Sequence, residues 1–135
     1  MENNSIILDI GMDFTKIGFS KDPIPRFILK TPLSISSVIR SKEHFGITVL
    51  ADLLQDTTKL KQEIQEFLYE IFTVHCLVKT TGNTVWILEQ LIFPRKFMQA
   101  LAEVLFLNFE FEWVYIFSRY FTALRNWTKF WVSIW

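Results

Sequence analysis

The opening segment constrains the fold most, because it places two short strands within a few residues of each other. Ser5–Ile10 and Phe14–Phe19 are rich in the β-branched and aromatic residues that favour extended backbone. The short link between them leaves room only for a tight turn, so the two strands must pair antiparallel. Arg26–Leu29 follows closely enough to add a third antiparallel strand. The chain is therefore predicted to begin as a β-hairpin that extends into a meander.

Apolar periodicity predicts a helix in the middle of the chain. The segment from Lys30 to Asp56 is Ser-rich and has no sustained apolar period, so we expect a mostly irregular connection there. After it, apolar residues recur at helical spacing with charged residues between them: Leu60, Ile64, Phe67, Leu68, Ile71 and Phe72. This pattern is typical of an amphipathic helix that buries one face.

A strand–helix–strand pattern follows. Thr84–Leu88 and Trp113–Phe117 are compact apolar runs of strand length, and we interpret each as a strand buried on both faces. Phe97 through Asn108, between them, continues at helical spacing. Short links on either side of the helix indicate a βαβ unit with parallel pairing and a right-handed crossover. The predicted fold class is therefore α/β, with a hairpin or meander first, then a helix and a βαβ unit.

Composition excludes several classes of function. The 135 residues suffice for one domain, and 50% of them are apolar. The 14 basic residues balance the 14 acidic ones, so the chain has no general attraction to nucleic acid. A single cysteine cannot form an intramolecular disulfide, and two histidines with one cysteine cannot complete a zinc site. We expect a reducing compartment.

His75 and Cys76 are adjacent, which raises the question of a nucleophile and its base. Adjacent residues on a helix point about 100° apart, however, so their side chains do not meet. Cysteine is also commonly buried as a small apolar residue. We therefore interpret Cys76 as structural.

Two segments of the chain resemble the actin superfamily. Asp9–Phe19 resembles that family's first phosphate loop, which has an acidic residue, a glycine in the turn and Lys-x-Gly-Phe on the second strand. Phe97–Glu110 reads Phe-x-x-x-Leu-x-x-Val-Leu-Phe-x-x-Phe-Glu and is similar to a helix of the family's actin-related proteins. The resemblance implies that residues 1–124 are a partial actin-like ATPase half-domain of ribonuclease H-like fold. Residues 125–135 form a Trp-rich tail that diverges from the family.

The resemblance also implies roles for three residues of the hairpin. Asp9 matches the acidic residue that holds the nucleotide-bound cation through water. Gly11 matches a glycine whose N–H approaches phosphate oxygens, and Lys16 matches a lysine that faces the phosphates. These three residues are the candidate cofactor-binding site, for ATP with magnesium as in the family. No catalytic residue and no direct metal ligand are expected.

Departures from the family pattern argue against hydrolysis. Met12 replaces a serine whose hydroxyl meets the terminal phosphate, and Asp13 replaces a glycine and puts a negative charge beside a polyanion. Arg119 falls where the family carries the glutamine that positions the attacking water, and arginine cannot act as a general base. The family's second phosphate loop would follow Phe117, but the chain stops at Trp135. We therefore expect a C-terminally truncated, non-catalytic form.

The function implied by the resemblance is that of a structural subunit in the pointed-end complex of dynactin. Its expected partners are the actin-like filament and the pointed-end subunits of dynactin, during dynein-driven movement along microtubules. Its expected location is the cytoplasm, on the cytoskeleton. The alternative is a nucleotide-binding actin-like ATPase.

The C-terminal segment is rich in aromatic residues. Basic residues interrupt its apolar stretch, so no membrane span is expected: Arg119, Arg125 and Lys129. A tryptophan recurs at every fourth position, as on one side of a helix: Trp127, Trp131 and Trp135. This stripe is compatible with packing on the sheet, with binding a partner or a membrane surface, or with chance. The sequence does not rank these alternatives.

Overall fold

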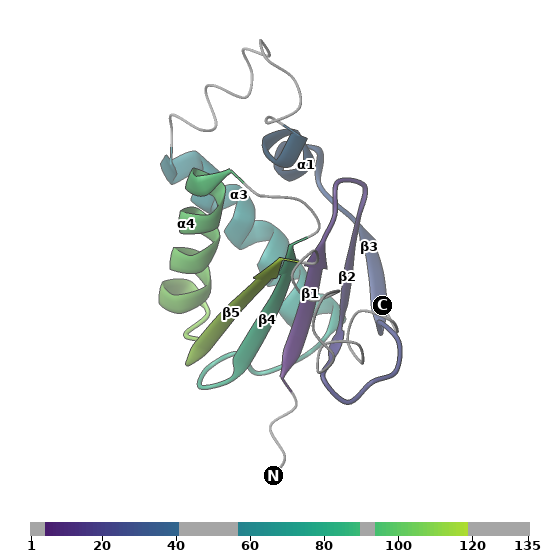
Figure 1. Ribbon diagram of the computed structural model, residues 1–135. Helices are drawn as coiled ribbons and strands as arrows, with labels where there is room; N and C mark the ends of the chain where they lie inside the picture. The colour runs from purple at the N-terminus through teal and green to yellow at the C-terminus, as the bar shows by residue number, and fades with distance from the viewer. Residues whose placement is uncertain (1–4, 41–56, 90–93, 119–135) are drawn as a thin grey trace.

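A computed structural model describes residues 5–40, 57–89 and 94–118, which form a mixed sheet with helices on one face (Figure 1). The sheet has five strands in the order β3-β2-β1-β4-β5. Their bounds are β1 Ile6–Ile10, β2 Phe14–Phe19, β3 Phe27–Lys30, β4 Thr84–Glu89 and β5 Trp113–Ser118. The predicted α/β class is confirmed, and the described residues are consistent with a partial actin-like half-domain.

Strand β1 lies at the centre of this sheet. It pairs antiparallel with β2, with Asp9 opposite Lys16, and β2 pairs antiparallel with β3. On its other side β1 pairs parallel with β4, which in turn pairs parallel with β5. The predicted hairpin, third antiparallel strand and parallel β4–β5 pair are therefore confirmed.

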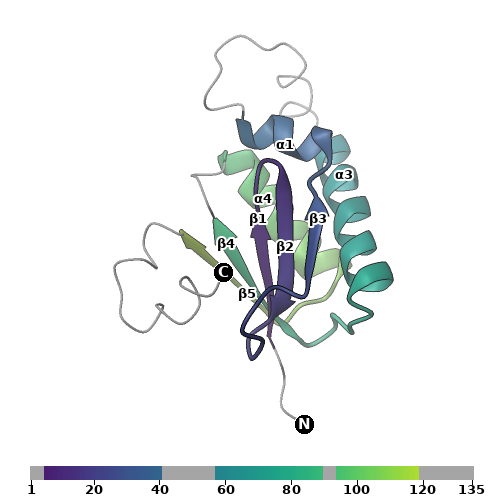
Figure 2. The same ribbon diagram turned by 90° about the vertical axis from the view of Figure 1, so that its right-hand side faces the viewer.

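The described chain also contains three α-helices: α1 Leu33–Arg40, α3 Thr57–Tyr69 and α4 Arg95–Glu103. Helix α3 continues into a π-helical segment, η1 Glu70–His75, and α4 continues into another, η2 Val104–Asn108. Helices α3 and α4 lie on one face of the sheet, and α1 lies at one end (Figure 2). The two predicted amphipathic helices are confirmed.

The prediction of an irregular connection over residues 30–56 is wrong for its first part. Helix α1 occupies Leu33–Arg40 and buries Ile35, Val38 and Ile39 in the core. These three residues do have helical spacing, but the serines among them weaken helix propensity and hid the pattern. Packing against the sheet and the Ser34 hydroxyl, which donates to the Glu63 carboxylate at 3.1 Å, support the helix. Residues 41–56 lie outside the described residues.

The prediction that β5 is buried on both faces is also wrong. Trp113 and Tyr115 are 56% and 39% exposed, whereas Val114 and Ile116 pack against the core. The difference arises because β5 ends the described sheet and receives helices on one face. Strand β4 comes closer to the prediction, since Val85, Ile87 and Leu88 are buried.

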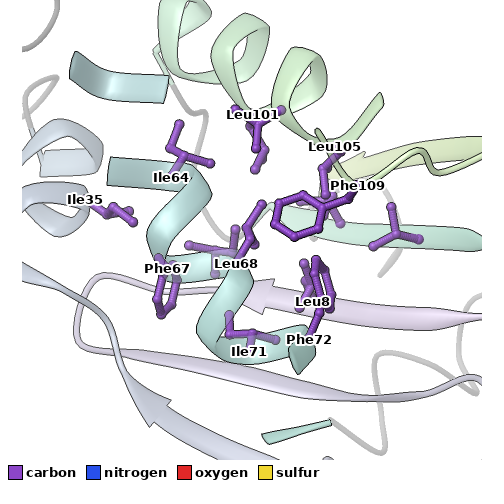
Figure 3. Packing of buried hydrophobic residues seen from close by; sticks show 14 of the residues in the cluster. Leu8, Ile35, Ile64, Phe67, Leu68, Ile71, Phe72, Leu101, Leu105 and Phe109 are labelled. Carbon is purple, nitrogen blue, oxygen red and sulfur yellow. The ribbon is translucent and has the colours of Figure 1, made fainter. Parts of the chain in front are cut away.

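The core lies between the sheet and the helix layer (Figure 3). Phe72, on η1, is fully buried near the centre of this core. Its ring makes edge contacts with Phe109 and Phe111, at centroid distances of 5.2 and 5.4 Å. Leu8 from the sheet and Leu101 from α4 belong to the same core cluster, so the sheet and the helix layer share one core (Figure 3).

The two long helices end in the same way. The Val78 N–H donates to Phe72 O at 3.0 Å, and the Phe111 N–H donates to Leu105 O at 3.2 Å. After each helix the chain turns through one non-glycine residue in the left-handed region. These residues are Leu77, with φ 50°, and Glu110, with φ 56°. Glycine is the residue that normally occupies this position after a helix.

In the described stretches of the chain, no helix combines the length and the apolar character needed to cross a bilayer. The predicted Trp-rich tail at 125–135 and its tryptophan stripe lie outside the described residues, as does Arg119.

We predict that Leu77→Gly stabilises the protein by about 1 kcal/mol, because it removes the strain of a left-handed leucine. Leu77 is 81% exposed, so its side chain contributes little packing to lose. Chemical denaturation with circular dichroism measures the change. The matched control is Leu107→Gly, which is 75% exposed but lies within η2 and should destabilise by about 1 kcal/mol. A loss of stability in Leu77→Gly would contradict the prediction.

Candidate functional site

The hairpin brings two of the predicted site residues together. Asp9 on β1 and Lys16 on β2 are direct register partners, so their side chains project from the same face of the sheet. Asp9 is fully buried and Lys16 is half-buried. This face is opposite the helix layer, because the alternate residues Leu8, Ile10 and Ile17 enter the core. The pairing follows from strand register alone, and the role of this pair toward a phosphate stays a prediction.

The Gly11 N–H, the third predicted element, closes the hairpin. It donates to the Phe14 carbonyl oxygen at 3.0 Å across the turn. An amide that makes this bond is not available to a phosphate oxygen unless the turn opens. In this conformation the hairpin therefore lacks the backbone donor that the resemblance implies.

Thr31 secures the same turn from a distant part of the sequence. Its hydroxyl donates to the Gly11 carbonyl at 2.8 Å and lies 2.8 Å from the Thr15 hydroxyl. Its backbone N–H donates to the Asp13 carbonyl at 2.9 Å. Both threonines are buried, so these bonds are shielded from water. Sequence reasoning missed Thr31; a threonine before Pro32 gives no signal that distinguishes it from an ordinary loop residue.

The remaining turn residues fit a phosphate poorly. Met12 packs its half-buried side chain against the core, so it offers no hydroxyl where the family has serine. Asp13 is exposed at the tip of the turn and adds a negative charge there. In the described part of the chain, no three His, Cys, Asp or Glu side chains gather into a group able to hold a metal ion. The turn therefore offers neither the side-chain hydroxyl nor the free backbone N–H that the resemblance implies.

Cys76 and His75 do not form a nucleophile–base pair. Burial raises the pKa of Cys76 to about 11, against the opposing effect of the Arg26 charge. The thiol is therefore protonated at neutral pH and is a poor nucleophile. The His75 ring instead lies 6.0 Å from the ring of Phe27, and its Nε2 is 3.6 Å from a Glu70 carboxylate oxygen. This arrangement agrees with the interpretation of Cys76 as structural.

Comparison with known proteins bears on the ancestry of this hairpin. No protein-family model matches the chain. The chain is 32% identical over 121 residues to actin-related protein 10 of Dictyostelium discoideum. The match supports an actin-superfamily relationship. It covers 76% of this chain and 26% of that protein, so the chain spans about a quarter of the length of the relative.

An actin-superfamily relationship gives a reason for the placement of Asp9, Gly11 and Lys16. They occupy the hairpin positions that the resemblance assigns to a phosphate loop, and the hairpin exists as predicted. In this structure the turn is closed by the Gly11 N–H and by the Thr31 hydroxyl. The hairpin therefore lies where the sequence predicts it, but the Gly11 N–H is already hydrogen-bonded and is not a free donor.

We predict that Thr31→Val destabilises the protein more than Thr15→Val. The Thr31 hydroxyl donates to Gly11 O, so the Thr15 hydroxyl must be the donor in the bond between the two threonines. Thr31→Val leaves both a buried donor and a buried acceptor unsatisfied and should cost about 2–3 kcal/mol. Thr15→Val leaves the bond to Gly11 intact and should cost about 1 kcal/mol. Urea unfolding measures both, and equal or reversed losses would contradict the assignment.

We predict that Cys76 resists alkylation near neutral pH. With a pKa of about 11 in the folded chain, its thiolate fraction at pH 8 is roughly 100-fold below that of an unfolded cysteine. Because the folded pKa is raised, its contribution to stability is complete below the unfolded pKa and declines as pH rises toward 11. Iodoacetamide labelling followed by mass spectrometry, native against urea-unfolded, measures the difference. Equal rates at pH 8 would show that the thiol is not buried as described.

Proposed function

We propose that this chain is a non-catalytic, actin-related structural protein that acts in the pointed-end complex of dynactin. There it would contact the actin-like filament and the pointed-end subunits and support dynein-driven movement along microtubules. The proposed location is the cytoplasm, on the cytoskeleton. The similarity to actin-related protein 10, over 76% of the chain, supports the structural class.

One observation supports a non-catalytic role above the others: the amide of Gly11 closes the hairpin turn. A phosphate loop stabilises its ligand through free backbone N–H groups that converge on the phosphate oxygens. Here that N–H donates to Phe14 O, and the Thr31 hydroxyl donates to the Gly11 carbonyl oxygen. Opening the turn would strand several buried polar groups, each at a cost of about 1–3 kcal/mol. Binding of a nucleotide would have to overcome that cost.

Co-precipitation from cells tests the proposed partners. The tagged chain should recover the actin-like filament and pointed-end subunits of dynactin. Leu8→Asp provides the control, because a charge at this fully buried position disrupts the core and should abolish recovery. Failure of the folded chain to recover any dynactin subunit would contradict the proposed complex and leave only the relationship by descent.

A nucleotide-binding assay tests the alternative of an actin-like ATPase. We predict that a fluorescent ATP analogue with magnesium shows no saturable binding at micromolar concentration. Lys16→Ala should therefore leave the signal unchanged, and so should Lys30→Ala, a lysine that is exposed on the neighbouring strand. Micromolar binding that Lys16→Ala abolishes and Lys30→Ala preserves would instead establish a nucleotide site at the hairpin.

A further inference from the structure

Strand β3 has one edge that pairs with no other described strand, because β3 is the outermost strand of the sheet next to β2 (Figure 1). In an antiparallel pair of strands, hydrogen-bonded and non-hydrogen-bonded residue pairs alternate. The Thr31 N–H donates to Asp13 O at 2.9 Å, which continues the register of β2 and β3 by one position. Counting back by two, Leu29 also bonds to β2, so the backbone N–H and C=O groups of Ile28 and Lys30 point toward the free edge.

The free edge of β3 is accessible and has apolar surface beside it. Ile28 is 60% exposed, and Lys30 is exposed as well. Phe14, which lies opposite Lys30 on β2 and diagonal to Ile28, is 56% exposed. Natural proteins protect an open edge with charges, prolines or bulges, whereas this edge places one lysine between two exposed large apolar side chains. Such an edge is a template on which another extended segment can pair.

The charge beside the free edge is positive. Lys30 has Phe14 opposite it, and no side chain in residues 5–40, 57–89 and 94–118 forms an ion pair with it. Lys16, the other cation on this face of β2 and β3, lies opposite Asp9 on β1 and so already has a carboxylate beside it. A carboxylate directly opposite Lys30 on an added strand would form a favourable cross-strand pair. The edge therefore favours an acidic segment.

We propose that the free edge of β3 binds an extended acidic segment of a partner protein, which joins the sheet as a further antiparallel strand. The outward backbone groups of Ile28 and Lys30 allow about four main-chain hydrogen bonds to this segment. Because the added strand runs antiparallel, an acidic residue opposite Lys30 is followed two positions later by an apolar residue opposite Ile28. The main-chain bonds supply affinity, and these two side-chain positions supply specificity. The proposal concerns this edge alone and does not depend on the proposed role in dynactin.

A second copy of the chain fits this edge less well than an acidic segment does. Two β3 strands that pair around a two-fold axis at Leu29 would place Ile28 of each copy opposite Lys30 of the other. Both lysines would then lie on the same face of the joined sheets with no carboxylate between them. The other symmetric registers set Lys30 directly opposite Arg26 or opposite Lys30 of the second copy, and like charges in that position destabilise the pairing.

Fluorescence anisotropy with labelled synthetic peptides tests the edge in the full chain. The acidic peptide has the core Thr-Glu-Thr-Val-Thr, with glutamate to face Lys30 and valine to face Ile28, and a second peptide carries lysine in place of the glutamate. The chain should bind the acidic peptide saturably and at least about fivefold more tightly than the lysine peptide. Lys30→Glu should reverse this preference. The matched control is Lys79→Glu, which makes the same change of charge at an exposed lysine outside the sheet and should preserve the preference.

Methylation of the peptide backbone tests the main-chain pairing without any change to the protein. An N-methyl group on the glutamate removes the donor that faces the Lys30 carbonyl oxygen, and it should weaken binding at least about tenfold. An N-methyl group on the central threonine, whose N–H points away from β3, should leave binding unchanged.

Reversal of the charge preference in Lys30→Glu, together with sensitivity to methylation at the glutamate alone, supports the proposal. Circular dichroism confirms that each variant is folded. Absence of saturable binding to the folded chain would overturn the proposal and give Lys30 and the short length of β3 a protective role. Equal effects of the two methyl groups, or an unchanged preference in Lys30→Glu, would overturn it as well. Dimers of the chain in sedimentation velocity that the acidic peptide does not dissociate would assign the edge to a second copy and also overturn it.

Discussion

Strand β1 imposes the constraint on which the rest of this structure depends, because its two edges pair in opposite senses. Its antiparallel pairing with β2 needs only a tight turn, so Asp9 and Lys16 become neighbours within one local hairpin. Its parallel pairing with β4 requires the chain to cross from one end of the sheet to the other. Helices α1 and α3 lie on that crossover, and their apolar sides fill the space between them and the sheet.

Strong local patterns predicted most of this architecture from the sequence. The β-branched and aromatic runs in β1 and β2 and the helical spacing of Ile64, Phe67 and Phe72 are local signals, and tertiary packing agrees with them. Helix α1 was missed because serines interrupt a short apolar pattern, and contacts with distant residues decide its conformation. The exposure of β5 was missed because an apolar run cannot show which of its faces another element covers.

In the candidate site, too, local sequence patterns predict some features and contacts with distant residues decide others. The neighbourhood of Asp9 and Lys16 follows from a two-residue period and a short turn, so sequence reasoning reaches it. The state of the Gly11 amide does not follow, because it depends on the geometry of the turn, which Thr31 stabilises from twenty residues away. A resemblance transfers residue identities, but hydrogen-bond partners are properties of the folded chain. The sequence pattern could therefore predict the position of the turn but not which of its donors are already hydrogen-bonded.

The Asp9–Lys16 pair lies on the face of the sheet that is opposite the helix layer, and its neighbours on that face are apolar. The register aligns Phe117, Leu88, Asp9, Lys16 and Ile28 in one row across all five strands. At this level of the sheet Asp9 has the buried side chain of Leu88 on one side and Lys16 on the other. Apolar neighbours lower the local dielectric, which strengthens interactions among the charges already there and penalises an added polyanion without a new cation. These surroundings of the Asp9–Lys16 pair thus favour a structural role over nucleotide binding.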